Sequence, residues 1–232
     1  MAPKTRIPKV RTLHLPIIVL IMTSLFASTL AASVDEDFAA LEEIADAFPP
    51  KISTKEEKAK ALALYSRVKL QFDKDVKGHP GDKQILLKRA RLESFGHNLD
   101  VKGAFEEAQR DFLALLKQDS NFEPAMLALA RLWVNTNPQY APQAEKLFRA
   151  VQCRHGNEPV EEAQRGLFFA LYYQGRMLEA KRQIEFLTAR WPDNEAYKRL
   201  REATSAVLAR AGTQDKPAGG QAPAKDMLAT CQ

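Results

Sequence analysis

The stretch from Pro159 to Asn194 decides the fold of this chain, and it reads PVEEAQRGLFFALYYQGRMLEAKRQIEFLTARWPDN. A first apolar helical face is followed by Gly175, then by a second apolar face that stops at Pro192. Apolar residues at three- and four-residue steps are typical of amphipathic helices, whereas isolated glycine and proline mark turns and helix ends. The stretch is therefore predicted to form a helix-turn-helix unit.

Residue types within this unit stand at fixed distances from Ala180, a small residue of the second helix. Leu167 lies thirteen residues before it and Gly175 five before it, while Ile184 and Pro192 lie four and twelve residues after it. These residue types at these offsets closely resemble the 34-residue pattern of the tetratricopeptide repeat. The resemblance implies a pair of antiparallel helices that stacks on further pairs of the same kind.

Two positions of the unit depart from the family pattern. Gln164 stands where the family usually has a large aromatic residue, and the bulky Phe168 stands where it usually has a small one.

Two further units with this pattern precede the first. Ala108 and Ala144 take the place of Ala180 in them, and the three alanines follow one another at intervals of 36 residues. In the middle unit the loop Asn135–Pro138 adds two residues to the family spacing and is expected to form a longer turn. Three units are about the minimum that buries a continuous core. The resemblance thus implies an all-α fold, an α-solenoid of tetratricopeptide-type repeats with about nine helices in the chain.

Helix start and stop signals place the other elements. An apolar face over residues 36–48, which includes Phe48, predicts a helix that the following prolines end. The next helix is predicted to start at Ser53, because Glu56 three residues later completes a capping-box signature. Asp82 and Asn194 are predicted N-caps of later helices.

The predicted organisation is a signal peptide or anchor over residues 1–33, an N-terminal helical pair over 34–81, three repeat-like units over 82–194, a capping helix over 195–211 and a disordered tail over 212–232. A solenoid needs such a helix to cover its exposed end. Its inward residues are expected to be Tyr197, Leu200, Ala203, Val207 and Leu208. The tail is rich in Gly, Pro, Ala and Gln, a composition that does not pack.

The first 33 residues have the three-part layout of a secretory signal peptide. Basic residues come first, an apolar run from Leu15 to Leu30 follows, and small residues end at Ser33. The expected protein is periplasmic or secreted after cleavage. In the alternative, the apolar stretch of about 17 residues stays uncleaved and anchors the protein in the inner membrane, facing the periplasm.

Net charge argues against a nucleic-acid partner. The chain carries a formal charge of +5, but four of its 34 Lys and Arg residues lie in the leader, which leaves 30 basic against 29 acidic residues. Nucleic-acid binding modules carry a basic patch or stripe. We therefore expect no nucleic-acid binding.

Sequence motifs for catalysis, cofactors and metals are absent from the chain. Cys153 and His155 lie close together, but two ligands fall short of the three or four that zinc needs. No Gly-rich phosphate loop, nucleophile elbow or paired-histidine zinc motif occurs. The prediction is a protein without enzymatic activity, cofactor or metal. A disulfide between Cys153 and Cys231 would suit an exported protein, but the repeat core does not require it.

The resemblance implies that the first helices of the units line a concave groove that binds peptides or partner helices. The expected partner-binding residues are Phe169, Tyr172 and Tyr173 in the third unit, Leu127 and Arg131 in the middle unit, and His97 in the first. In the alternative interpretation the three aromatic residues only pack under the capping helix or against the neighbouring unit. Family members that clamp the C-terminal carboxylate of cytosolic chaperones use Lys and Asn where this chain has Glu93 and His97, so that clamp is not expected here.

The resulting hypothesis is a non-enzymatic protein-protein interaction scaffold of the bacterial cell envelope that binds a peptide or a partner subunit in its groove. The alternative is a membrane-anchored accessory subunit of an envelope assembly or secretion complex. A small-molecule binder that uses the aromatic residues is a third hypothesis. The sequence indicates neither the partner nor the oligomeric state.

Overall fold

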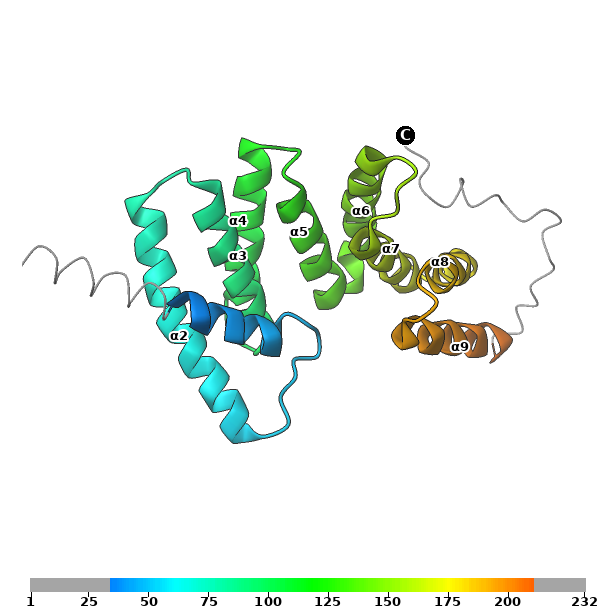
Figure 1. The fold of residues 1–232 in the computed structure, drawn as a ribbon, viewed down its shortest axis with the longest axis horizontal. Helices are drawn as coiled ribbons and strands as arrows, with labels where there is room; N and C mark the ends of the chain where they lie inside the picture. The colour runs from blue at the N-terminus through cyan, green and yellow to red at the C-terminus, as the bar shows by residue number, and fades with distance from the viewer. Residues whose placement is uncertain (1–33, 211–232) are drawn as a thin grey trace, which may run out of the picture.

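A computed structural model of the protein describes residues 34–210, and within this range the chain is all-α, with no β-strand (Figure 1). The helices are residues 34–45, α2 (Lys55–Gly78), α3 (Lys83–Asn98), α4 (Ala104–Gln118), α5 (Glu123–Thr136), the short 3₁₀ helix η1 (Pro138–Tyr140), α6 (Ala141–His155), α7 (Glu161–Tyr173), α8 (Met177–Arg190) and α9 (Glu195–Arg210). The expected signal peptide or anchor, the expected tail and Cys231 lie outside the described residues. Within residues 34–210, no helix combines the length and the apolar character that a membrane crossing requires.

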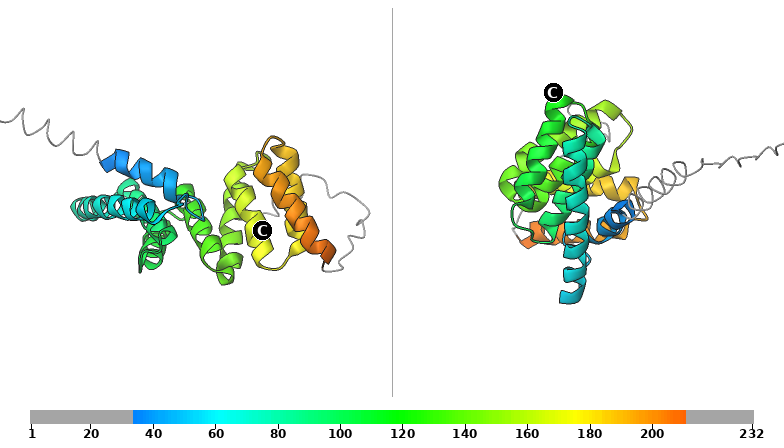
Figure 2. Two further views of the ribbon diagram at one scale, coloured as in Figure 1. Left: turned by 90° about the horizontal axis from the view of Figure 1, so that it is seen from below. Right: turned by 90° about the vertical axis from the view of Figure 1, so that its left-hand side faces the viewer.

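Successive helices pack side by side in chain order along the long axis of the molecule (Figure 1). In addition, α5 contacts both α3 and α7, so these three helices form a continuous row. Helix 34–45 lies across α2 and α3 instead of extending the row, as the two further views show (Figure 2). Its carboxyl end therefore points toward α5.

The hydrophobic core continues through the molecule as three clusters. The first joins helix 34–45, α2 and α3 around Phe38, whose ring centroid lies 5.3 Å from that of Phe72 and 5.5 Å from that of Phe95. The second joins α3, α4 and α5 around Phe112, and the third joins α5 to α9 around Phe148. Since the clusters follow one another along the chain, each pair of helices depends on its neighbours for burial.

Several predicted helix boundaries are confirmed by their caps. The side chain of Asp82 accepts hydrogen bonds from the second and third backbone N–H groups of α3, and Asn194 does the same for α9. Gly175 joins α7 to α8 with a φ of 72°, a left-handed conformation that favours glycine. The lengthened turn of the middle unit is η1, between α5 and α6.

Two predictions for the N-terminal pair were wrong. The N-cap of α2 is Thr54 with Glu57, one residue beyond the predicted Ser53 and Glu56, and the complete capping box forms there. The first helix ends at residue 45, so Phe48 does not share its buried face and is 58% exposed. Residues that precede a proline avoid the helical conformation, which explains why the helix stops before Pro49.

The inward face of α9 also differs from the prediction. Tyr197, Thr204 and Leu208 are buried, whereas Ala203 and Val207 are exposed. The buried residues of α9 therefore follow one another at intervals of seven and four residues. The polar Thr204 can be buried among them because its hydroxyl donates a hydrogen bond to the carbonyl of Leu200, one turn earlier.

The two departures from the repeat pattern are accommodated by their surroundings. The Gln164 side chain is fully buried, donates to Gln152 Oε1 at 2.7 Å and accepts from Gln183 Nε2 at 2.6 Å. This chain of three glutamines links α6, α7 and α8. The small residue near the bulky Phe168 is Gly166, two positions earlier in the chain. The ring of Phe148 packs so closely on Gly166 that a Cβ added to this glycine would lie 2.2 Å from the ring.

Candidate binding groove

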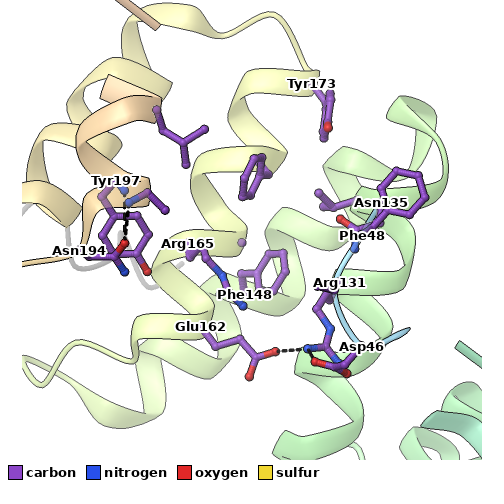
Figure 3. Close-up of a pocket in the computed structure, with 16 residues that line it drawn as sticks. Asp46, Phe48, Arg131, Asn135, Phe148, Glu162, Arg165, Tyr173, Asn194 and Tyr197 are labelled. Atoms are coloured by element: carbon purple, nitrogen blue, oxygen red, sulfur yellow. Dashed lines mark hydrogen bonds and ion pairs between the residues drawn. The ribbon is translucent and has the colours of Figure 1, made fainter. Parts of the chain in front are cut away.

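A cavity of about 360 Å³ opens between α5, α7 and α9 (Figure 3). The loop that follows helix 34–45 supplies one wall of it through Asp46, Ala47 and Phe48, and the start of α9 supplies the opposite wall through residues such as Asn194 and Leu200. Segments about 150 residues apart in sequence thus enclose the same cavity. The site is therefore formed by several separate segments rather than by one helical pair.

The lining of the cavity is mainly apolar. Val134, Phe148, Phe169 and Leu200 are buried or partly buried within it. Two aromatic residues on the lining stay exposed, since Phe48 is 58% and Tyr173 is 42% accessible to solvent. Aromatic side chains supply large contact area at low conformational cost, which suits a binding surface.

Charged side chains gather at the edge of the cavity nearest the N-terminal loop. The Arg131 guanidinium donates two hydrogen bonds to Asp46, at 2.9 Å to Oδ2 and 2.7 Å to Oδ1, and its Nη1 lies 3.6 Å from Glu162 Oε1. Figure 3 shows Arg131 between these two carboxylates. A bidentate pair of this kind fixes both partners in orientation. Arg131 therefore holds the loop against α5 and is paired with carboxylates of the same chain.

Arg165 is the other cation that lines the cavity. Its side chain is exposed, and within residues 34–210 it makes no hydrogen bond or ion pair. In Figure 3 it lies between Phe148 and Tyr197. The cavity thus has one arginine that is satisfied internally and one that is available to a partner.

A second hollow of about 510 Å³ continues the groove along α5 toward α3. It shares Asp46, Arg131 and Glu162 with the first cavity, and Leu127 lines its floor. An ion pair between Arg91 and Glu42 tethers helix 34–45 to α3 beside this hollow. The ion pair of Arg131 and Asp46 lies on the lining of both hollows. The loop that carries Asp46 therefore stands at the boundary between the two hollows.

Four of the six expected partner-binding residues line the two hollows. Phe169 and Tyr173 line the first cavity, Leu127 lines the second, and Arg131 lines both. Phe169 also packs against the core cluster that contains Tyr197, so the alternative interpretation of packing under α9 describes part of its environment.

Tyr172 and His97 lie elsewhere. Tyr172 packs against the core, with its ring centroid 6.0 Å from that of Phe168. The Nε2 atom of His97 lies 3.0 Å from Thr136 Oγ1, and the histidine ring packs on Phe105. Burial lowers the pKa of His97, despite the opposing charges of Asp100 and Glu106.

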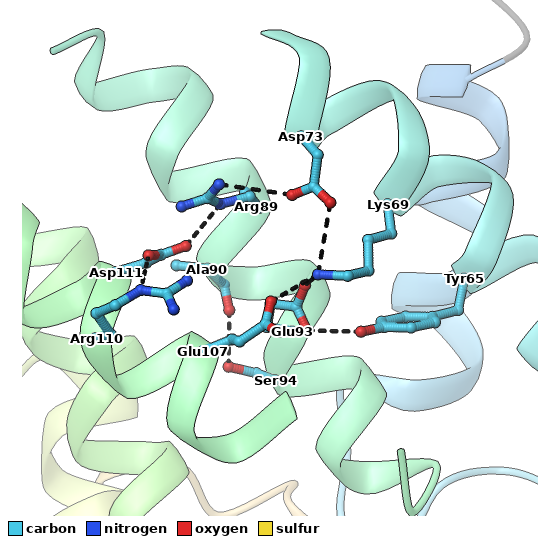
Figure 4. Close-up of polar contacts among 10 residues, drawn as sticks. All are labelled: Tyr65, Lys69, Asp73, Arg89, Ala90, Glu93, Ser94, Glu107, Arg110 and Asp111. Atoms are coloured by element: carbon cyan, nitrogen blue, oxygen red, sulfur yellow. Dashed lines mark hydrogen bonds and ion pairs between the residues drawn. The ribbon is translucent and has the colours of Figure 1, made fainter. Parts of the chain in front are cut away.

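Glu93, which the resemblance to the repeat pattern placed on the groove, is instead 1% exposed (Figure 4). Tyr65 Oη donates to it at 2.6 Å, and Lys69 Nζ donates both to Glu93 and, at 2.6 Å, to Glu107. Burial and the hydrogen bond to Glu93 raise the pKa of Tyr65. Because α2 covers this position, the network joins α2, α3 and α4 internally and leaves Glu93 inaccessible to a partner.

The lining residues of the first cavity that the sequence did not predict as partner-binding include Arg165, Asp46 and Phe48. Arg165 had a usable signal, because it lies four residues before Phe169 and therefore on the same face of α7. Asp46 and Phe48 had none, because nothing local indicates that their loop reaches α5.

Within the described range, no group of three or more His, Cys, Asp or Glu side chains is arranged to hold a metal ion. No protein-family model matches the chain, and neither the curated proteins nor the solved structures contain a significant match to it.

Proposed function

We propose that this protein is a non-enzymatic tetratricopeptide repeat scaffold of a bacterial cell envelope, exported and built as an α-solenoid, that holds a peptide segment or a partner subunit in the groove along α5 and α7. The repeat spacing of Ala108, Ala144 and Ala180 supports the family, and the continuous row of α3, α5 and α7 suits a solenoid. The leader supports export.

The observation that carries the binding role is the cavity between α5, α7 and α9. It combines an apolar lining with two exposed aromatic side chains, Phe48 and Tyr173. Hot spots of protein interfaces are enriched in aromatic residues and arginine that fill or line desolvated pockets. An extended peptide or an exposed loop of a partner would bury these side chains.

Photo-crosslinking in cells tests this proposal. A photoreactive amino acid replaces Tyr173 on the cavity, and the control replaces the exposed Arg182 on α8. We expect adducts with another protein from position 173 and none from position 182. Adducts confined to the chain itself, or equal at both positions, would show that the cavity is not the binding surface.

The membrane-anchored accessory subunit remains the alternative form of the same scaffold. The two forms differ in mature mass, because cleavage after Ser33 removes the leader. Intact mass spectrometry of the protein from its native host separates them. A chain that begins at Val34 supports the exported form, and a chain that begins at Met1 supports the anchored form.

A small-molecule binder is the second candidate function, and the size of the cavity favours it. Ligand pockets typically measure about 300–1,000 Å³, and the cavity falls at the lower end of that range. The Trp191 ring lies 6.3 Å from that of Tyr197, which lines the cavity. A ligand in the cavity should therefore change Trp191 fluorescence, and a screen of small aromatic acids and amines that leaves it unchanged would contradict this candidate.

A further inference from the structure

The cavity between α5, α7 and α9 combines an apolar interior with a specific arrangement of polar groups at its edge. Arg131 and Asp46 are joined by two hydrogen bonds on the side of the N-terminal loop, and Glu162 forms a longer ion pair of 3.6 Å with Arg131. Arg165 stands apart from this group and has no hydrogen bond or ion pair within the described chain. Among the four charged side chains on the lining of the cavity, Arg165 is therefore the one that no other residue of the described chain pairs with.

Two asparagines on the lining of the same cavity can also donate hydrogen bonds to a partner. The side-chain amide of Asn135, on the opposite wall, makes no hydrogen bond within residues 34–210. The side-chain oxygen of Asn194 is used by the first turn of α9, which leaves its NH₂ group to donate. A guanidinium has five N–H donors and matches a carboxylate in two parallel hydrogen bonds.

Resting on the function proposed above, we infer that the bound segment of the partner presents a large apolar side chain next to a carboxylate. The apolar side chain, aromatic or aliphatic, enters the cavity against Phe148, Phe169 and Leu200. The carboxylate, from a neighbouring Asp or Glu, accepts hydrogen bonds from Arg165. The small volume of the cavity suits one or two side chains rather than a folded domain.

Partner segments of other composition fit the cavity less well. A purely apolar segment would leave Arg165 without a partner while covering it, and covering an unpaired charge is unfavourable. A basic segment would meet the Arg165 charge directly, and Asp46, one of the two acids on the lining, already accepts two hydrogen bonds from Arg131. A segment with an acidic group next to a large apolar side chain pairs with Arg165 and also fills the apolar interior of the cavity.

Selection from a library of random nine-residue peptides displayed on phage tests the inference. The target is the protein purified after expression of the full chain, and the control target is the same protein with the substitution Arg165→Gln. We expect the wild-type protein to enrich peptides in which Phe, Tyr, Trp or Leu stands within two positions of Asp or Glu. The variant should not enrich this acidic pattern, because it lacks the cation.

Binding measurements with a synthetic copy of the enriched peptide then give the coupling free energy between the carboxylate of the peptide and the guanidinium of Arg165. Replacing its acid by the corresponding amide should weaken binding to the wild-type protein by about tenfold, the scale expected of a charged hydrogen bond at a partly exposed site. The same replacement should change little in Arg165→Gln, while Arg182→Gln on the outer face should bind like wild type. Circular dichroism of Arg165→Gln checks that this exposed substitution leaves the helices intact.

The outcomes separate this inference from the proposed function. Enrichment of peptides that are basic, or that are apolar without an acid, would overturn the inference and leave peptide binding in place. Equal binding of the acid and the amide peptide to wild type would do the same. The absence of any enriched peptide, together with no partner adduct from position 173, would overturn both.

Discussion

Arg131 on α5 and Asp46 in the N-terminal loop form a bidentate ion pair, with hydrogen bonds of 2.9 and 2.7 Å between residues 85 positions apart in the sequence. The pair fixes the loop that carries Phe48 at one wall of the cavity. The two side chains are 25% and 29% exposed, so solvent screens the pair only in part. The N-terminal segment thus lines the cavity in addition to covering the first cluster of the core.

Removing the charge of Asp46 should loosen this contact. Asp46→Asn keeps the size of the side chain but cannot accept two charged hydrogen bonds, and we expect the free energy of unfolding to fall by about 1 kcal/mol. Urea denaturation of the purified protein measures the change. The matched control is Asp35→Asn, because Asp35 pairs with Lys88 at a site where the side chains are 63% and 48% exposed. Equal losses in the two variants would contradict a special role of the Arg131 contact.

Gly166 should tolerate no side chain. A Cβ at this position would lie 2.2 to 2.5 Å from atoms of the Phe148 ring, so Gly166→Ala forces the ring or α7 to move. We expect a loss of about 1–3 kcal/mol in the free energy of unfolding. Gly78→Ala, at the end of α2 with no atom within 4 Å of the added Cβ, is the control and should be neutral or slightly stabilising.

Adding Phe148→Leu to Gly166→Ala checks the cause of that loss. The smaller side chain should recover part of the stability if the clash is with the ring. A double variant that is as unstable as the sum of the two single variants would show that the strain lies elsewhere.

Much of the described helical layout could be predicted because its signals are local. The N-caps Asp82 and Asn194, the turn at Gly175 and the long turn before α6 all depend on residues within one or two turns of the helix end. The capping box of α2 was misplaced by one residue because Ser53 and Thr54 are both followed three positions later by glutamate. Such a pattern does not say which of two overlapping caps will form.

The groove was predicted less completely because its walls are set by tertiary contacts. The position of Glu93 on α3 indicates a groove residue, but α2 packs over it and supplies Tyr65 and Lys69 as partners. Phe48 looked like a core residue because its spacing continued the helical face that ends at residue 45. For Glu93 the deciding event is the docking of α2, which no local pattern records. For Phe48 the proline that follows ends the helix locally, but the contact of its loop with the cavity depends on α5, which is distant in sequence.

The buried glutamines between α6, α7 and α8 should be sensitive to loss of a single member. Gln164→Leu removes the acceptor of Gln183 Nε2 and the donor to Gln152 Oε1, so we expect a loss of about 1–3 kcal/mol in urea denaturation. Gln84→Leu, at an exposed position in the first turn of α3, is the control and should change stability little.

The double variant Gln164→Leu with Gln183→Leu should recover part of this loss, since replacing both partners of a buried hydrogen bond leaves fewer unsatisfied groups. A double variant that is less stable than either single one would instead assign the loss to side-chain shape.

Acid should destabilise the protein through His97. Burial lowers the pKa of this side chain below its ordinary value of 6.5, so at pH values just below 6.5 the unfolded chain binds a proton that the folded chain resists. The contribution of His97 to stability is therefore present above pH 6.5 and is lost as the pH falls through its folded pKa. Between pH 7.5 and 5.5 the free energy of unfolding should fall more steeply in wild type than in His97→Asn. Identical slopes would rule out His97 as the source.

Phe48 should matter for binding and not for folding. Its side chain is 58% exposed, so Phe48→Ser should change the free energy of unfolding by no more than about 0.5 kcal/mol. Because the same side chain lines the cavity, the substitution should reduce the yield of partner adducts from a photoreactive residue at position 173. Leu70→Ser on α2 is the matched control, since Leu70 is 62% exposed and lies outside the cavity lining, and it should leave both measurements unchanged. If Phe48→Ser leaves adduct formation at the wild-type level, the N-terminal loop takes no part in binding and only the α5, α7 and α9 walls contact the partner.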